Sequence, residues 1–348
     1  MANKLQSLIV TAIIFLSTQA TYADSRVKAI QQKLSELGYQ PGVADGIWGK
    51  NSEAALNQFL SSKGLIFDGT IDTNELELLE IFSFRYNIDD SLPAAWIDEF
   101  KNIMKILQEV LPVDKNFNRY VNNSTMDIYA WNGKVKNPFS EKRGMSGASI
   151  SGDGKTRWMV LEIPENEFKY DSLHRYSVIV HEYFHIYQIG LSKDRMDPKW
   201  LNEGGAKVLE EMFVQQYYGR SSLQGDFERA ELWSDEVFTN PKLYEKFETS
   251  SKETADGWMD MNYAGSAFIF LTLVNELQKQ SISEREAFKL VFRDFWIEKS
   301  NESNWEKAFE KTFNINIETF YKRLSEYSRK DIKKILPSKS LKIQNIFK

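Results

Sequence analysis

The strongest constraint on this chain is the motif HEYFH at residues 181–185, because it predicts a buried helix that carries two imidazoles. Histidines four positions apart lie on one face of a helix, one turn apart. Residues 178–180 and 186 are apolar, which is typical of a helix inside a core. The sequence has 3 histidines and no cysteine, so thiol chemistry is excluded and histidine chemistry is confined to His174, His181 and His185.

A second motif, WLNEGGA at residues 200–206, offers a carboxylate to this pair. Asp197-Pro198 predicts the start of its helix, and Glu203 lies in the first turns. Two glycines inside a helix cost roughly 2 kcal/mol in helix propensity, and a close approach between helices would explain them. We expect this helix to pack near the first one and to bring Glu203 to His181 and His185. Two imidazoles and one carboxylate form a three-ligand site for one Zn²⁺ per chain, with a position left open.

Together the two motifs resemble those of the gluzincin metallopeptidases, in which the two histidines and the later glutamate bind zinc. The resemblance implies that His181, His185 and Glu203 are the ligands and that Glu182 is the general base. It also implies a tyrosine that stabilises the negative oxygen formed during the reaction. The segment NYAGSAF at residues 262–268 resembles the part of the family that carries this group, which makes Tyr263 the candidate. Peptide or protein is the implied substrate.

Three alternatives stay open at this point. The motif at 181–185 alone also fits a pair of core histidines satisfied by hydrogen bonds. The chain could be a noncatalytic peptidoglycan-binding protein with a degenerate metallopeptidase fold, although an intact Glu182 argues against that. The enzyme could also cleave the peptide cross-links of peptidoglycan. Lys207 departs from the gluzincin pattern, because some members have an acidic residue there; the partners that orient the ligands are therefore not identified.

Residues 24–80 predict a separate small helical unit. Apolar residues at helical spacing lie in residues 27–37, turn dipeptides follow, Ser52 is expected to cap a second helix, and Asp72 or Thr73 a third. The unit resembles the three-helix peptidoglycan-binding domain of bacterial wall enzymes, which implies peptidoglycan as a partner. Tyr39 and Trp48 are the candidate ligand-facing rings, because an aromatic face stacks on a sugar. The matching positions are Val27, Ile30, Gln31, Leu34, Leu37, Gly38, Tyr39, Asp45, Gly46, Trp48, Gly49, Ala54, Ala55, Phe59, Leu65, Asp68 and Gly69.

The remaining segments complete a multidomain prediction. Residues 1–23 have the pattern of a signal peptide, which predicts export to a periplasmic or extracellular, wall-associated location with no stable membrane span after cleavage. The net charge of −5 argues against nucleic acid as a partner, since a nucleic-acid-binding protein normally has a basic face. We expect the small all-α module at 24–80, a linker at 81–93, an α+β zincin-like metallopeptidase domain at 94–330 and a solvated basic tail at 331–348. Strands are expected at 126–131, 148–151 and 157–163, the last as a substrate-pairing edge strand, before a mostly helical C-terminal half.

Overall fold

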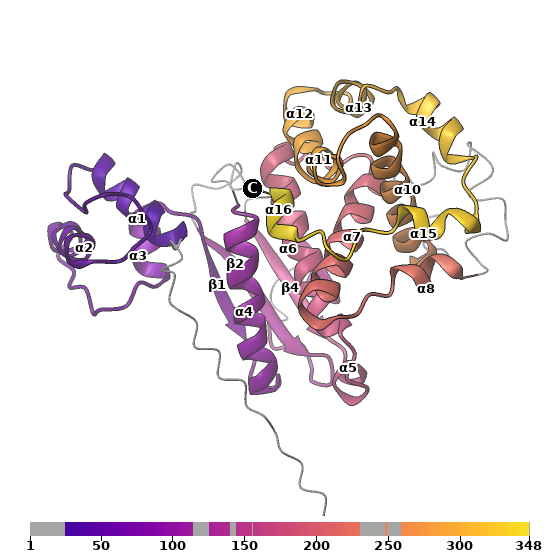
Figure 1. The fold of residues 1–348 in the computed structure, drawn as a ribbon. Coiled ribbons are helices and arrows are strands. Elements are labelled where there is room, and N and C mark those ends of the chain that lie inside the picture. Colours follow the sequence, from indigo (N-terminus) through magenta and orange to yellow (C-terminus); the bar gives the residue numbers. More distant parts are fainter. Residues whose placement is uncertain are drawn as a thin grey trace, which may run out of the picture. The chain divides into compact units, whose positions relative to one another are not determined.

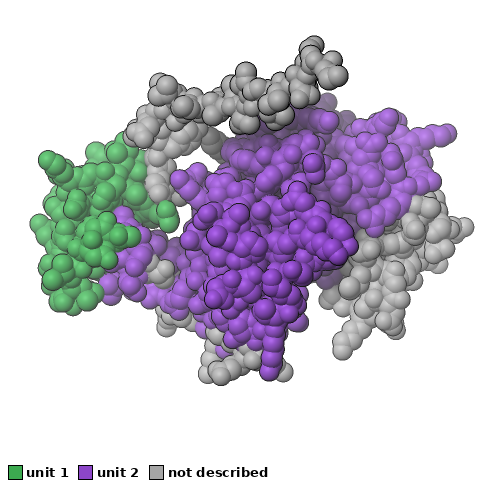
Figure 2. All heavy atoms as spheres, turned by 90° about the horizontal axis from the view of Figure 1, so that it is seen from below, with its two compact units in different colours: residues 1–70 green, residues 71–348 purple. Residues whose placement is uncertain are grey.

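The computed structural model describes residues 25–113, 125–139, 144–154, 156–229, 248 and 259–347. The chain divides into two compact units, Met1–Thr70 and Ile71–Lys348 (Figure 2). The predicted signal peptide at 1–23 lies outside the described residues. No helix within the described ranges has the length and apolar character needed to cross a membrane.

The first unit contains two helices, α1 (Ser25–Glu36) and α2 (Lys50–Ser62). Ile30 and Leu34 on α1 are fully buried, as is Leu56 on α2. This helical pattern is the one that the spacing of apolar residues predicted.

A buried amide, rather than an apolar contact, organises the loop between these helices. The Gln31 side chain donates to Ile47 O at 3.0 Å and to Ser52 Oγ at 3.0 Å, and its Oε1 accepts from Gly46 N at 2.9 Å. Ser52 in turn donates to Pro41 O at 3.1 Å. Ser52 is therefore not the helix cap that the sequence suggested. The N-cap is Gly49, and the Ser52 hydroxyl links α2 to the loop.

The boundary region differs from the predicted linker at 81–93. A capping box at Asp72 starts the short helix α3 (Thr73–Leu78), which belongs to the second unit by its contacts. Residues Ser83–Ile88 then form strand β1. Only Ser83 and Phe84 of β1 are buried. The apolar pattern of this segment is therefore too short to distinguish a strand from a linker by sequence alone.

The second unit is built on a mixed four-stranded sheet with the order β1-β2-β4-β3. β1 and β4 pair with β2 in parallel, and β3 pairs with β4 antiparallel. The three strands expected from the sequence are confirmed within one or two residues. Their bounds are Thr125–Asn132 for β2, Ala148–Gly152 for β3 and Arg157–Ile163 for β4.

The prediction that residues 157–163 form an edge strand is wrong. β4 lies inside the sheet, between β2 and β3, and four of its central residues, 158–161, are buried. A near-continuous apolar run is typical of such an interior strand. The edge on this side is the antiparallel strand β3, whose residues 148–151 are half-exposed.

Helices cover one face of this sheet (Figure 1). Met159 and Leu161 of β4 point into the same large core as Phe100 of α4 and Phe184 of α6, whereas Trp158 and Val160 point to a small cluster on the other face. α6 contacts both β3 and β4, and α7 packs between α6 and α10. The bounds are Ala94–Val110 for α4, His174–Ser192 for α6, Lys199–Tyr218 for α7 and Met259–Lys279 for α10.

The remaining helices surround this centre and confirm a mostly helical C-terminal half. They are α5 (Glu165–Lys169), α8 (Leu223–Glu228), α11 (Glu284–Lys289), the π-helical turn η4 (Leu290–Asp294), α12 (Phe295–Asn301), α13 (Trp305–Phe313), α14 (Ile317–Leu324), η5 (Arg329–Asp331), α15 (Ile332–Ile335) and α16 (Ile343–Phe347).

The segment from residue 331 onward is not the solvated tail that its lysines suggested. Ile343 and Ile346 of α16 are fully buried, and the Phe347 ring lies 5.7 Å from those of Tyr187 and Phe292. The lysines described in this segment lie at exposed positions, while isoleucines three positions apart are buried. The number of lysines alone did not reveal this pattern. The segment contributes to the core of the second unit.

Candidate metal centre

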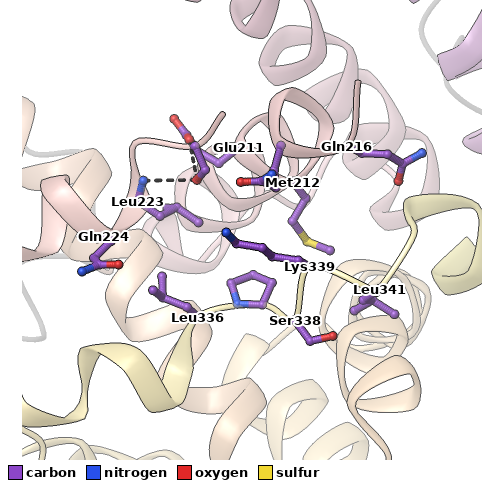
Figure 3. A pocket seen from close by; sticks show the side chains of 12 residues that line it. Glu211, Met212, Gln216, Leu223, Gln224, Leu336, Ser338, Lys339 and Leu341 are labelled. Atoms are coloured by element: carbon purple, nitrogen blue, oxygen red, sulfur yellow. Dashed lines mark hydrogen bonds between the residues drawn. The ribbon is translucent and has the colours of Figure 1, made fainter. Parts of the chain in front are cut away.

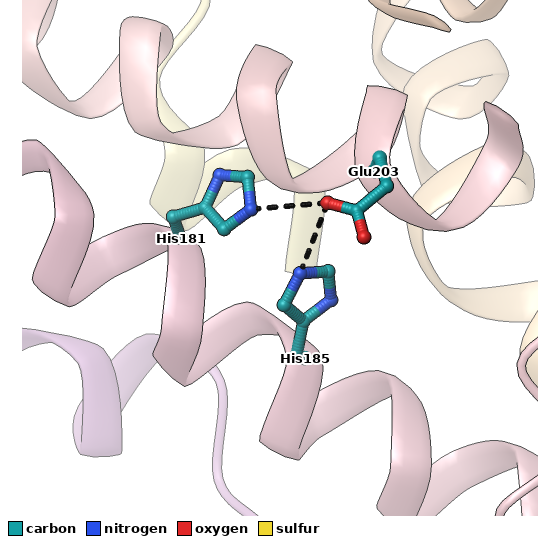
Figure 4. Close-up of side chains that lie close together, drawn as sticks. All are labelled: His181, His185 and Glu203. Atoms are coloured by element: carbon teal, nitrogen blue, oxygen red, sulfur yellow. Dashed lines mark hydrogen bonds and ion pairs between the residues drawn. The ribbon is translucent and has the colours of Figure 1, made fainter. Parts of the chain in front are cut away.

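Helices α6 and α7 bring His181, His185 and Glu203 together (Figure 4). One ligand atom from each residue lies within 4.8 Å of the other two. Glu203 Oε2 is 3.3 Å from His181 Nε2 and 3.4 Å from His185 Nε2. Two imidazole nitrogens and one carboxylate oxygen converging on one point form the donor set that suits zinc.

The two glycines of α7 lie where neighbouring helices approach closely: Gly204 faces α10, and Gly205 faces both α6 and α10. A Cβ atom on Gly204 would lie 2.3 Å from Ser266 O of α10. A Cβ on Gly205 would lie 3.0 Å from the Phe184 ring of α6. The close approach expected toward α6 therefore involves Gly205, and the tighter one, at Gly204, is to α10.

Residues beyond the ligands fix the orientation of both imidazoles. His181 Nδ1 lies 3.0 Å from Glu210 Oε2, and His185 Nδ1 lies 2.9 Å from Gln188 Oε1. Such partners hold a metal-binding histidine in one ring orientation and tautomer. The sequence analysis missed both of them, although Glu210 lies seven positions after Glu203 and hence on the same face of α7.

Lys207, which departs from the gluzincin pattern, contacts the carboxylate of Glu210 and so takes part in this arrangement. Its Nζ lies 2.8 Å from Glu210 Oε1 and 2.8 Å from Glu211 Oε1. Burial opposes its charge, but the two carboxylates outweigh that cost and raise the pKa of Lys207. The ammonium therefore fixes the free oxygen of the carboxylate that orients His181.

Without a metal, charges and hydrogen bonds within the site shift the pKa values of His181 and Glu203. Burial lowers the pKa of His181, but hydrogen bonds to Glu203 and Glu210 outweigh it and raise the value to about 10. Burial likewise opposes ionisation of Glu203, yet the attraction of His185 and hydrogen bonds from both rings hold its pKa well below the usual range. The metal-free site therefore carries an ionised Glu203 and a proton on His181 that a metal would have to displace.

Glu182, the candidate general base, is buried beside His181. It is 5% exposed, and its Oε2 is buried with no hydrogen-bond partner among the described residues. Burial also raises its pKa, which favours proton uptake. A buried carboxylate oxygen with no protein partner next to a ligand histidine fits a site built to hold a further group.

Tyr263 also reaches this region. Its ring centroid lies 5.6 Å from that of His181, in an edge-to-face arrangement. Burial, together with the charge of Glu203, raises the pKa of the phenol, so the hydroxyl keeps its proton and remains a donor.

A cleft of about 540 Å³ is lined by His181, Glu182 and Tyr263. Its wall includes Ala148 at the start of the edge strand β3, which places that strand beside the candidate base. Its lining residues are Ala148, His174, Val178, His181, Glu182, Lys207, Glu210, Ser222, Asp226, Arg229, Tyr263 and Ala264.

His174 stands on the wall of the cleft and outside the ligand group, as its spacing predicts. It is the first residue of α6, and its Nδ1 lies 2.8 Å from Glu167 Oε1. That hydrogen bond raises the pKa of His174.

A second, smaller pocket of about 190 Å³ lies between α7, the start of α8 and the segment at 336–341 (Figure 3). Glu211 lines it, and the same carboxylate accepts from Ser221 Oγ at 2.9 Å and from Ser222 Oγ at 2.7 Å. Ser222 belongs to the wall of the larger cleft, so the two cavities lie on either side of this turn. Among the residues described there, the smaller pocket contains no histidine.

The rings proposed to meet peptidoglycan are half-buried and packed against neighbours. Tyr39 contacts Phe59 edge-to-face at 5.8 Å, and its hydroxyl lies 3.2 Å from Ser62 Oγ. Trp48 lies 6.2 Å from the Phe67 ring. Each therefore contributes to the packing of the first unit and keeps part of its surface in solvent.

Comparison with known families identifies the N-terminal part of the chain. Residues 23–79 match the family model for a peptidoglycan binding domain. The chain therefore carries a peptidoglycan-binding domain, which makes peptidoglycan a partner and suggests association with the cell wall. No curated protein and no solved structure matches the chain.

Proposed function

We propose that this chain is an exported, zinc-dependent peptidase that its N-terminal domain directs to the cell wall. The observation that carries the proposal is the convergence of His181, His185 and Glu203 within 4.8 Å, beside the unpartnered Oε2 of Glu182. A zincin-like, gluzincin-type arrangement of the second unit is part of the same proposal. His181, His185 and Glu203 would hold the ion, which would polarise the scissile carbonyl and lower the pKa of a water molecule.

Glu182 acts as the base in this proposal. Its Oε2 takes a proton from the water that attacks the carbonyl carbon, and it then gives that proton to the leaving nitrogen as the C–N bond breaks. The raised pKa of Glu182 suits both transfers, because the group must accept a proton and then release it.

Tyr263 and β3 orient the substrate. The protonated phenol of Tyr263 can donate a hydrogen bond to the oxygen that becomes negative. The exposed edge of β3 can pair with the backbone of an extended peptide, and Ala148 places this edge at the cleft.

The peptidoglycan-binding domain favours a substrate fixed in the wall. Tethering raises the local concentration of such a substrate without any new contact at the catalytic site. The substrate is then a wall-bound protein or, as the second candidate, a peptide cross-link of peptidoglycan itself.

The test compares wild type with Glu182→Gln and His185→Ala in the full chain. Wild type should contain about one zinc per chain and should cleave an unstructured protein or a cross-linked peptidoglycan peptide. Glu182→Gln keeps the shape of the side chain and should keep the zinc while hydrolysis falls at least about 10²-fold. His185→Ala should lose most of the zinc.

Two results would contradict the proposal. Full zinc retention in His185→Ala would remove that residue from the ligand set. A zinc-loaded wild type that cleaves neither substrate would instead favour a noncatalytic wall-binding protein.

A further inference from the structure

The two oxygens of the Glu203 carboxylate have different partners. Oε2 faces the histidines, at 3.3 Å from His181 Nε2 and 3.4 Å from His185 Nε2. Oε1 instead lies 3.2 Å from Nζ of Lys199. A cation therefore occupies the side of the carboxylate that points away from the two imidazoles.

Lys199 is held in this place by the start of α7. It is the first residue of the helix, one turn before Glu203, so the two side chains lie on the same face. Its backbone N–H donates to Glu248 O at 3.0 Å, and the next two residues, Trp200 and Leu201, are fully buried. The side chains of Lys199 and Glu203 are 30% and 12% exposed, so this pair is shielded more than an ordinary surface ion pair.

We propose that Lys199 is a positioning residue for the metal site: it holds Oε1 of Glu203, so that a metal receives one carboxylate oxygen, and its charge limits the affinity for that metal. This inference rests on the proposed function only in assuming that the three ligands bind a divalent cation. Because a carboxylate can bind a cation through one oxygen or through two, a group that occupies Oε1 keeps one more position free for substrate or water.

The sign of the effect follows from the charges. A lysine ammonium next to a ligand carboxylate repels a divalent cation and also competes with it for the carboxylate. Removing the ammonium should strengthen metal binding. It should also let Glu203 rotate and offer both oxygens, which fills the position that catalysis needs.

The experiment uses the full chain with Lys199→Met and Lys199→Arg. Lys289→Met is the matched control, because Lys289 is also 30% exposed, also pairs with a glutamate, Glu286 at 3.6 Å, and makes none of the described contacts with the three ligands. Zinc affinity is measured by competition with a chelator. The coordination number is followed by the visible absorption of the Co²⁺-substituted protein, which weakens when a further ligand atom is bound.

We expect Lys199→Met to bind zinc about three- to tenfold more tightly, since one nearby charge at partly solvated distances contributes on that order. Its Co²⁺ absorption should weaken, and kcat should fall more than KM rises. Lys199→Arg should stay close to wild type in all three, as should Lys289→Met. An unchanged zinc affinity and an unchanged Co²⁺ spectrum in Lys199→Met would show that the ion pair between Lys199 and Glu203 is only a contact on the helix surface. Weaker zinc binding in this variant would show that the ammonium favours metal binding rather than opposing it.

The experiment distinguishes failure of the proposed function from failure of the role proposed for Lys199. If wild type binds no divalent metal, the proposed function fails and takes this inference with it. If wild type binds metal and Lys199→Met is indistinguishable from Lys289→Met, only the role of Lys199 is refuted.

Discussion

Replacing Gly204 by alanine tests whether the contact between α7 and α10 sets the position of Glu203. The added Cβ would lie 2.3 Å from Ser266 O and 2.6 Å from Ser266 C. Both are backbone atoms within α10, so relief requires one helix to move. Overpacking of this kind costs about 1–3 kcal/mol, and the direct backbone clash places Gly204→Ala at the upper end. Alanine regains about 1 kcal/mol of helix propensity, which leaves a net loss of about 2 kcal/mol in the free energy of unfolding.

Thermal unfolding is the assay. For a unit the size of Ile71–Lys348, a loss of about 2 kcal/mol lowers Tm by roughly 3–4 °C. Gly225→Ala in α8 is the matched control, because nothing lies within 4 Å of its added Cβ, and this variant should unfold at the same or a slightly higher temperature. Gly204→Ala should also bind zinc more weakly, since Glu203 is the adjacent residue. A Tm at or above that of wild type would refute the close-contact explanation for this glycine.

Three further predictions concern the chemistry of the site. Because the pKa of metal-free His181 is raised to about 10, its ring holds a proton at neutral pH that zinc must displace. Zinc affinity should therefore rise about tenfold per pH unit between pH 6 and 9. Competition with a chelator across this range tests the prediction, and an affinity that does not change with pH would contradict it. Glu210→Gln removes the negative charge that orients His181 and should weaken zinc binding by about 10–100-fold, measured in the same competition; unchanged affinity would leave Glu210 without a role at the metal. Tyr263→Phe removes only a hydroxyl donor, so kcat on a peptide should fall by about 10²-fold with zinc content unchanged; equal rates would exclude the phenol from the reaction.

The convergence of His181, His185 and Glu203 could be predicted from the sequence, because the spacing of the two histidines fixes how they lie on their helix. Four positions between His181 and His185 place them on one helical face whatever the rest of the fold does. Glu203 could be added because a glycine pair inside a helix indicates close packing. The strands at 125–132 and 157–163 were also recognisable, from runs of apolar and β-branched or aromatic residues.

What could not be predicted depends on contacts between segments distant in sequence. The order of strands decides that β3 and not β4 lies at the edge, and no local pattern encodes that order. Glu210 of α7 acquires its role only when α6 and α7 are packed side by side, whereas Gln188 lies three positions after His185 on the same helix and could have been found from that spacing. Lys207 also departs from the pattern expected from sequence. Its contact with Glu210 is relevant to the site only because Glu210 also contacts His181 on the neighbouring helix.

The burial of α16 affects the order in which the second unit can fold. This helix packs against α4, α7 and α11, so some of the last residues described complete a core that begins with residues near 100. Contacts between such distant segments form slowly, because the entropy of closing the long intervening loop is lost before the contact stabilises the chain. The nascent body is then incomplete until residues 343–347 are available.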